Sequence, residues 1–407
     1  MRDLLFYGGK DLQIEREMPD ADAHTNWLEL INRLHLTADY RMWVSANLAL
    51  QTVQCILSDS KKQQVSVGMG KGMNHMPVLG AEFESIEHLF YNSQTHSAKQ
   101  RVLVSQIMEQ DLDFLDDPAL NQLSKNTKLT VDSFVDIESS KEVYYPSFLS
   151  DVNFIDDGVS INNHAYQYAS DSGYASGSTV NEALLHSINE LIERDSISRF
   201  IIKYGLGIKE NSVTAFKIIP KSLPKDLYKI YLGLKDTVDT EVILVKVINN
   251  YQIPTYFTAV LSQGSDILPI YGSGSSVDER YAVMRSLTEA YQLVSVKKGS
   301  ESQQLRKRLN LIWSEISPMK KMMSLTFTKK LASIRYHQHD IYVKEVDRMI
   351  SYERERLRQE GRKIYYRVVK EDPGFVLVQS LIPHFERFNL VFEGQIVTPR
   401  LSRNGHQ

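Results

Sequence analysis

Acidic residues recur at helical spacing after three short segments rich in glycine and serine. The segments are 70–72, 176–179 and 272–274, and the polar residues that follow them are Glu84, Glu87, Glu182, Glu190, Glu193, Arg194, Asp278, Arg285, Glu289 and Gln292. Small-residue loops and helix N-termini bind phosphate through backbone N–H groups. Mg²⁺ prefers carboxylate oxygens. We therefore predict that the three loop–helix units converge on one pocket for a polyphosphate and its metal ions.

Helical geometry groups these residues further. Glu84 and Glu87 are three positions apart and share a face, and Glu190 and Glu193 repeat that spacing. Glu182 lies on the same side, and Arg285, Glu289 and Gln292 fall within about 60° of one another on a third helix. Two Glu-x-x-Glu pairs can hold two divalent ions. The alternative, a solvated polar helix face, stays open, because neither G-x-x-x-x-G-K-[ST] nor an opening G-x-G-x-x-G is present.

The bulk composition narrows the class of protein. The chain has 407 residues, 42% hydrophobic and 24% charged, with a net charge of −3, which argues against bulk binding of nucleic acid or of an anionic membrane. The single cysteine, Cys55, excludes an internal disulfide. The N-terminus lacks an apolar signal core, and no apolar run approaches the ~20 residues of a spanning helix. We expect a cytoplasmic protein.

The elements that must position the acidic residues alternate along the chain. Residues 1–63 form a lead-in region, and 64–407 form the main domain, with a charged insertion near 298–361. Hydrophobic patterning predicts helices at 77–91, 181–204 and 341–361, the last ended by Gly361, and the third small-residue loop with its helix at 272–297. It predicts strands at 64–69, 242–249, 255–261, 363–369 and 375–382. This order predicts an α+β fold with mixed sheets covered by helices.

The motifs around the second and third units resemble those of the YcaO family. The stretch 172–183 with Glu190-Leu191-Ile192-Glu193-Arg194-Asp195 is similar to N-G-x-A-x-G-N-T-x-x-E-A…E-x-x-E-R-D. Residues 272–292 resemble G-x-G-x-H-x-D…R-A-L-T-E-A-x-Q. Weaker similarity joins 70–87 to G-K-G…S-x-x-x-E-x-x-E-R, and 374–383 to a G-x-P-V-x-R-x-x-V-P-G strand. The resemblance covers about residues 64–390.

The resemblance implies a YcaO-type fold that binds ATP and Mg²⁺ and phosphorylates the oxygen of a peptide backbone amide. It implies that Mg²⁺ is held by Glu84, Glu87, Glu190 and Glu193. The cofactor-binding residues would be Lys71, Ser178, Glu182, Arg194 and Arg285, and the catalytic residues Arg285, Glu289 and Gln292. Four positions depart from the family pattern, namely Gly80, His88, Ser178 and Ser276, which stand for Ser, Arg, Asn and His. The metal-binding carboxylates are intact, so ATP binding is still expected.

The activity implied first is azoline-forming cyclodehydration of Cys, Ser or Thr in a ribosomally made peptide. Thioamide formation from sulfide is the close alternative, because residues 398–407 lack the Pro-x-Pro-x-Pro tail of many cyclodehydratases. A non-catalytic scaffold that binds ATP or peptide is a third reading, motivated by the four departures. The expected partners are the precursor peptide and either a ThiF-like, leader-binding protein or a TfuA-like protein, with a homodimer left open. No nucleic-acid or membrane partner is expected.

Overall fold

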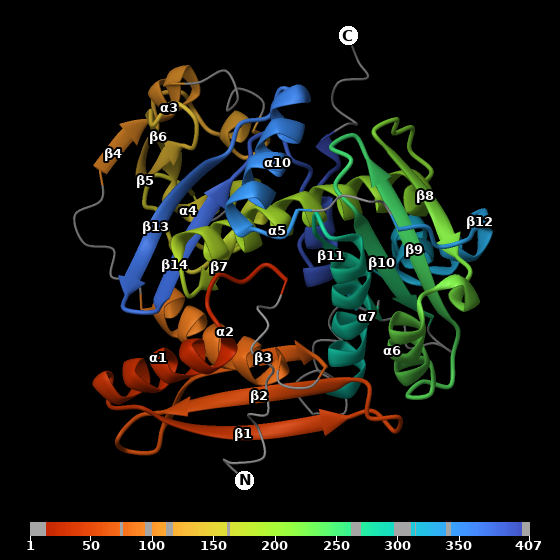
Figure 1. Cartoon of the computed structure of the whole chain (residues 1–407). Helices are drawn as coiled ribbons and strands as arrows, with labels where there is room; N and C mark the ends of the chain where they lie inside the picture. Colours follow the sequence, from red (N-terminus) through yellow and green to blue (C-terminus); the bar gives the residue numbers. More distant parts are fainter. Residues whose placement is uncertain are drawn as a thin grey trace.

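The computed structural model describes residues 14–73, 76–93, 100–110, 117–160, 163–261, 270–296, 311–313, 315–338 and 343–400. Three β-sheets are arranged around a long central helix, with further helices packed on the sheets (Figure 1). The predicted α+β architecture is therefore confirmed. Among the described residues, no helix combines the length and hydropathy that a membrane span requires.

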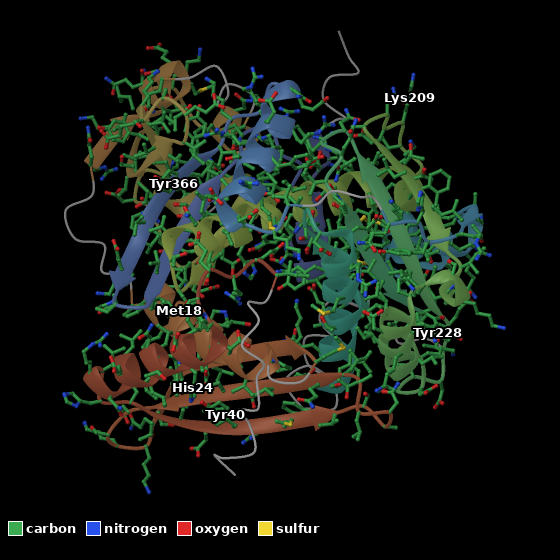
Figure 2. All side chains as sticks on the ribbon, viewed as in Figure 1. Met18, His24, Tyr40, Lys209, Tyr228 and Tyr366 are labelled. Atoms are coloured by element: carbon green, nitrogen blue, oxygen red, sulfur yellow. The ribbon has the colours of Figure 1, made fainter. Side chains whose placement is uncertain are left out.

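The first sheet is a three-stranded antiparallel meander of β1 (Thr37–Val44), β2 (Gln51–Ser58) and β3 (Gln64–Gly72). Helices α1 (Asp20–Arg33) and α2 (Met76–Asn92) lie beside each other on it (Figure 1). The carboxylate of the buried Glu82 in α2 accepts hydrogen bonds from Tyr40 (2.7 Å) and His24 (2.9 Å), both labelled in Figure 2. This bonding fixes α1 and β1 to α2. The expected boundary at residue 63 falls between β2 and β3 of this one sheet.

The second sheet has the order β11-β10-β9-β8-β12. Its strands are β8 (Val213–Ile218), β9 (Val242–Asn249), β10 (Thr255–Val260), β11 (Ile270–Ser275) and β12 (Ser333–Ile334). Helices α6 (Lys225–Lys235) and α7 (Glu279–Val296) pack on it through an apolar cluster. The predicted strands at 242–249 and 255–261 are confirmed almost to the residue, because their continuous apolar runs are buried in this sheet.

The third sheet has the order β4-β5-β13-β14-β7, with β6 paired to β5. The strands are β4 (Gln100–Leu103), β5 (Lys128–Asp136), β6 (Glu142–Pro146), β7 (Tyr174–Gly177), β13 (Tyr365–Asp372) and β14 (Phe375–Leu381). Short helices α3 (Val104–Gln110) and α4 (Ser147–Ser150) accompany it. Helix α10 (Val346–Gln359) ends just before Gly361, which has a φ of +68°, as the sequence predicts.

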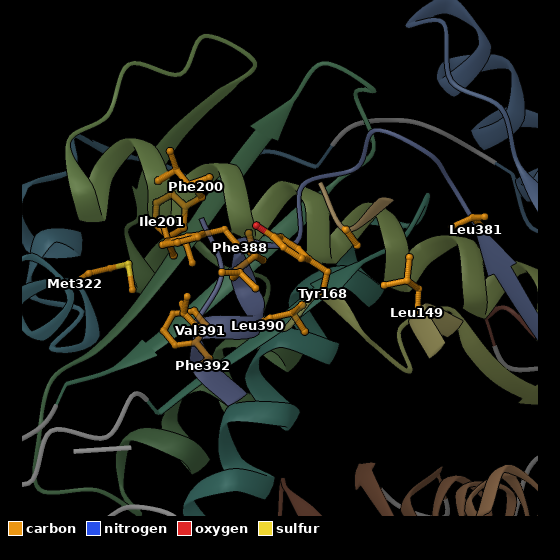
Figure 3. Close-up of a cluster of buried hydrophobic side chains, with 14 of the residues drawn as sticks. Leu149, Tyr168, Phe200, Ile201, Met322, Leu381, Phe388, Leu390, Val391 and Phe392 are labelled. Atoms are coloured by element: carbon orange, nitrogen blue, oxygen red, sulfur yellow. The ribbon is translucent and has the colours of Figure 1, made fainter. Parts of the chain in front are cut away.

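The central helix α5 (Val180–Phe200) is buried along most of its length and continues into a π-helical turn at Ile201–Leu206. The end of α5 lies in a large apolar core, in which Phe200, Ile201, Met322 and Phe388 gather (Figure 3). Met322 belongs to α9 (Ser317–Met323), so part of the stretch expected to be an insertion contributes to the core. This packing makes α5 the axis from which the site is built.

One sequence prediction about these elements is wrong. The first and third small-residue segments are not loops, because 70–72 lies in β3 and 272–274 lies in β11, whereas the second ends β7 at 176–177 and leaves the strand at 178–179, just before α5. The glycines serve close packing of a helix on its strand. A Cβ on Gly70 would lie 1.6 Å from the carbonyl oxygen of Pro77 in α2, and one on Gly272 would lie 2.2 Å from that of Ser286 in α7. Each glycine therefore lets a helix and its acids lie directly against the strand.

Candidate active site

A cavity of about 340 Å³ lies where α2, α5 and α7 face one another, and β3 and β7 contribute to its wall. This volume is within the range of ordinary small-molecule sites. Most of the residues predicted from the sequence line it, namely Lys71, Glu84, Glu87, Glu190, Glu193, Arg194, Arg285 and Glu289. The three strand–helix units therefore do converge on one pocket, although they do so as strands followed by helices.

One side of the cavity, which we call the acidic wall, consists of Glu84, Glu87, Glu190 and Glu193. Burial, with a smaller contribution from neighbouring carboxylates, raises the pKa of Glu87 to about 7 and that of Glu190 to about 8, although Ser176 and Arg194 respectively act in the opposite direction. Burial also raises the pKa values of Glu84 and Glu193. These pKa shifts mean that negative charge on this wall is poorly compensated by the protein.

Two serines from the strands orient this wall. Ser176 in β7 donates to Oε2 of Glu87 at 2.7 Å, and Ser273 in β11 donates to Oε1 of Glu193 at 2.5 Å. Within the described ranges, no three His, Cys, Asp or Glu side chains form a preassembled metal site. The wall nevertheless fits Mg²⁺, which commonly takes one or two carboxylates, several waters and phosphate oxygens instead of a closed protein cage.

A second group of lining residues, which we call the basic wall, consists of Lys71, Arg285 and Arg16. Lys71 Nζ lies 3.1 Å from Oε2 of Glu289. Burial alone would raise the pKa of Glu289, but Lys71 and two arginines outweigh it, so that this pKa is lowered. The only acid paired with a lysine in this cavity lining is thus held ionised, in contrast to the acidic wall.

His186 lies on α5 beside the basic wall and lines the cavity. Its Nε2 is 3.3 Å from Nη2 of Arg285, and a guanidinium can only donate, so Nε2 accepts and the proton is assigned to Nδ1. Burial, followed by the charges of Arg285, Arg16 and Lys71, lowers the pKa of His186 well below its usual value. The imidazole is therefore neutral at physiological pH.

Arg194 lies beside the acidic wall. Its Nε lies 3.6 Å from Oε1 of Glu190, and its Nη1 lies 4.0 Å from the carboxylate of Glu393. The Nε atoms of Arg194 and Arg285 are both buried without a hydrogen-bond partner among the described residues. Buried donors of this kind suit an anionic ligand, since they are costly to leave unsatisfied. The donor set thus fits phosphate oxygens as well as the acidic wall fits Mg²⁺.

The structure does not bring three of the predicted residues to the cavity lining. Glu182 is buried, and Oε1 accepts from the backbone N–H groups of Glu17 (2.6 Å) and Met18 (2.9 Å). The backbone N–H of Ser178 donates to Oε2 of Glu182 at 2.9 Å. Gln292 lies one turn beyond Glu289 on α7. Their assignment to the nucleotide site stays a prediction.

Arg16, Asp171 and His186 are among the lining residues that the sequence reasoning missed. Helical spacing could have found His186, which is four positions from both Glu182 and Glu190. Asp171 precedes β7 and raises the pKa of Glu190 through its charge. No local pattern marks Arg16, because it comes from the segment before α1.

The departures from the family pattern have visible neighbours. His88 lines the cavity, its Nδ1 bonds to the carbonyl oxygen of Val67 at 2.7 Å, and its Nε2 lies 3.8 Å from Glu84. Ser276 donates to the buried Glu15. Gly80 lines the cavity, and a Cβ there would meet Gly70 at 3.5 Å, an ordinary contact. Of these positions, His88 acts directly on the acidic wall, because its charge lowers the pKa values of Glu84 and Glu87.

Comparison with known proteins identifies the family to which the chain belongs. A family model described as YcaO cyclodehydratase, ATP- and Mg²⁺-binding, matches residues 69–386. ATP and Mg²⁺, the predicted cofactors, are therefore confirmed as the ligands of the matching family. A search of curated protein sequences found no match.

Solved structures support the same fold at low identity. YcaO from Methanopyrus kandleri, bound with AMPPCP and Mg²⁺, has a TM-score of 0.68 at 14% identity, over 95% of this chain and 97% of that one. A heterocyclase in complex with substrate and cofactor has a TM-score of 0.65 at 15% identity, over 93% of this chain, which spans 54% of the heterocyclase. A chain of the E. coli microcin synthetase McbBCD complex has a TM-score of 0.56 at 13% identity, over 86% of this chain and 88% of that one. With a family model that matches most of its length, the chain belongs to the YcaO family.

Proposed function

We propose that this protein is an ATP- and Mg²⁺-dependent enzyme that activates backbone amides of a ribosomally made peptide and forms azolines at Cys, Ser or Thr. The observation that carries the proposal is a single cavity lined both by four buried carboxyl groups with raised pKa values and by cationic side chains. Mg-ATP has the complementary charge pattern, since its metal needs carboxylates and its phosphates need cationic donors. Membership of a family of cyclodehydratases supports the reaction class.

In this proposal the acidic wall holds Mg²⁺, and Lys71, Arg194 and Arg285 bind the phosphates. When bound, ATP would supply the phosphoryl group that turns the former amide oxygen into a good leaving group. The protein's contribution is positioning and charge neutralisation, as in other phosphoryl transfers. Neutral His186 leaves the charge of Arg285 available to the ligand, because an imidazole that accepts a hydrogen bond carries no charge of its own.

The proposed chemistry needs no enzyme nucleophile, because the attacking group belongs to the substrate. The residues that line the cavity include no cysteine. Cys55 lies instead in the apolar core of the first sheet, where burial raises the pKa of its thiol to about 12. A thiol with that pKa is not a nucleophile at neutral pH.

Thioamide formation uses the same cavity, with sulfide in place of the peptide side chain, and stays the second candidate. We further propose a partner protein, either ThiF-like and leader-binding or TfuA-like, that brings the precursor peptide. The E. coli microcin synthetase, whose fold is similar, is itself a complex, and one of its structures has pro-MccB17 bound.

The test uses the full-length protein with ATP, Mg²⁺ and a candidate precursor peptide encoded by a neighbouring gene. We expect ATP hydrolysis together with the loss of one water per azoline in the mass spectrum; replacement of oxygen by sulfur would instead identify a thioamide. Glu193→Gln should abolish both hydrolysis and product without unfolding the protein, while Glu355→Gln, a change on the exposed face of α10, should not.

Two results would contradict the proposal. Unchanged ATP hydrolysis in Glu193→Gln would remove the metal assignment. A wild-type protein whose thermal midpoint does not respond to Mg-ATP would point to the scaffold reading instead, since a ligand that binds the folded state must raise its stability.

A further inference from the structure

The segment that precedes α1 contacts the central helix α5 and contributes to the lining of the cavity. We call residues 14–18 the N-terminal strap. In Figure 1 this red segment rises from α1 towards β7 and α5, and Figure 2 labels Met18 on it, between the first sheet and the rest of the molecule. The strap lies outside the region that the family model matches.

Glu15 anchors one end of the strap. Its side chain is buried, and its Oε1 accepts hydrogen bonds from Asn189 Nδ2 in α5, at 3.1 Å, and from the hydroxyl of Ser276. The backbone of Glu15 has a φ of +66°, a conformation that costs energy for any residue other than glycine. The bonds to α5 and to the start of α7 hold it there.

Glu17 and Met18 anchor the other end. Their backbone N–H groups donate to the buried carboxylate of Glu182, and the side chain of Glu17 accepts from Thr179 and Asn181 at the start of α5. Arg16 is thus fixed on both sides by bonds that its neighbours make. Its own side chain is left to reach the cavity.

Arg16 lines the cavity beside His186 and Arg285. Its side chain is 23% exposed, and Nη1 makes one long contact, of 3.4 Å, to Oε2 of Glu182. A guanidinium has five N–H donors in a planar fork that matches phosphate oxygens. The Arg16 side chain therefore adds to the basic wall a cation whose further N–H groups can donate to a ligand.

We propose that Arg16 is a phosphate-binding residue of the nucleotide site and that Glu15 and Glu17 are its positioning residues. This inference rests on the proposed function, because it assumes that Mg-ATP occupies the cavity. It adds to that function a part of the site supplied by the start of the chain. Binding of the nucleotide should then hold the strap in place, since a ligand that contacts Arg16 bridges it to Arg285 and Lys71.

The experiment compares the affinity of full-length variants for Mg-ATP by isothermal titration calorimetry. Arg16→Gln should weaken binding roughly ten-fold or more, the usual size of a charge-assisted hydrogen bond, and Arg16→Lys should lie between it and the wild type. Glu17→Gln should weaken binding by a few-fold (about 2- to 5-fold), because it loosens the strap and leaves Arg16 present. Arg348→Gln, an exposed arginine on α10, is the matched control and should bind as wild type.

Two outcomes overturn the role of Arg16: an unchanged affinity in Arg16→Gln, or a higher one, which would identify the strap as a competitor of the nucleotide. If Arg16→Gln lowers the thermal midpoint, Arg16→Lys and Glu17→Gln decide, and wild-type affinity in both overturns the proposal. If the wild type binds Mg-ATP and Glu193→Gln does not, only the role of Arg16 is at stake. A wild type that fails to bind Mg-ATP overturns this inference and the proposed function together.

Discussion

The two walls of the cavity differ in how their charges are compensated. On the basic wall, Lys71 pairs with Glu289 and lowers the pKa of that carboxyl group. On the acidic wall, burial raises the pKa values of four carboxyl groups, and the charges of nearby carboxylates, Glu289 among them, add to the rise. The first arrangement is stable by itself, whereas the second is stable only with protons or a cation. The difference teaches that the acidic wall is shaped for a ligand more than for the stability of the empty protein.

The largest expected effect comes from neutralising one member of the acidic wall. Glu87→Gln keeps an oxygen to accept the hydrogen bond from Ser176 but removes a charge that the proposal assigns to Mg²⁺. We expect Mg-ATP affinity to fall by about 100-fold or more, while the free energy of unfolding of the ligand-free protein rises by the order of 1 kcal/mol. Titration calorimetry and urea unfolding measure the two quantities.

The control for that prediction is Glu29→Gln on the exposed face of α1, which should leave both quantities unchanged. A loss of stability in ligand-free Glu87→Gln would show that the acidic wall is compensated within the protein. The contrast between the walls would then be wrong.

The next effect has the opposite sign on stability. Lys71→Met leaves the largely buried carboxylate of Glu289 without its nearest cation. We expect the ligand-free protein to lose roughly 1–2 kcal/mol and Mg-ATP affinity to fall by about 10-fold. Lys61→Met, in the exposed turn before β3, is the matched control. A stability equal to that of the wild type would mean that Lys71 does not hold Glu289 ionised.

The walls also predict how stability depends on pH. In the folded state the pKa values of Glu87 and Glu190 are about 7 and 8, above the ordinary value of 4.5. Between pH 4.5 and these values the folded state therefore binds more protons than the unfolded state. The contribution of these two groups to the stability of the ligand-free protein is therefore most favourable near pH 4.5, the lower limit of this interval. It falls as the pH rises towards 8, at up to about 1.4 kcal/mol per pH unit for each proton. Mg²⁺ affinity should rise over the same interval. Urea unfolding at pH 6, 7 and 8, with and without Mg-ATP, tests this, and a stability that increases with pH would contradict it.

The sequence predicted the acidic wall because helical periodicity reports direction around an axis. Glu84 with Glu87, and Glu190 with Glu193, share a face within one turn, so each pair meets the cavity together. Two of the three predicted loops were wrong, since the same glycines that suit a phosphate loop also suit a strand covered closely by a helix. The strap had no local signal, because its place depends on bonds between residue 17 and α5, more than 160 positions along the chain.

The smallest expected effect follows from what periodicity omits, which is height along the helix. Gln292 points in nearly the same direction as Arg285 but lies seven residues further on, about 10 Å along α7. Glu182, eight residues before Glu190, is displaced by about 12 Å on α5 and bonds to the strap instead. We therefore expect Gln292→Ala to change Mg-ATP affinity by less than about two-fold, within the range of a surface change. A loss of affinity near that of Glu87→Gln would show that the nucleotide extends beyond the cavity along α7. The nucleotide site would then include the part of α7 that carries Gln292.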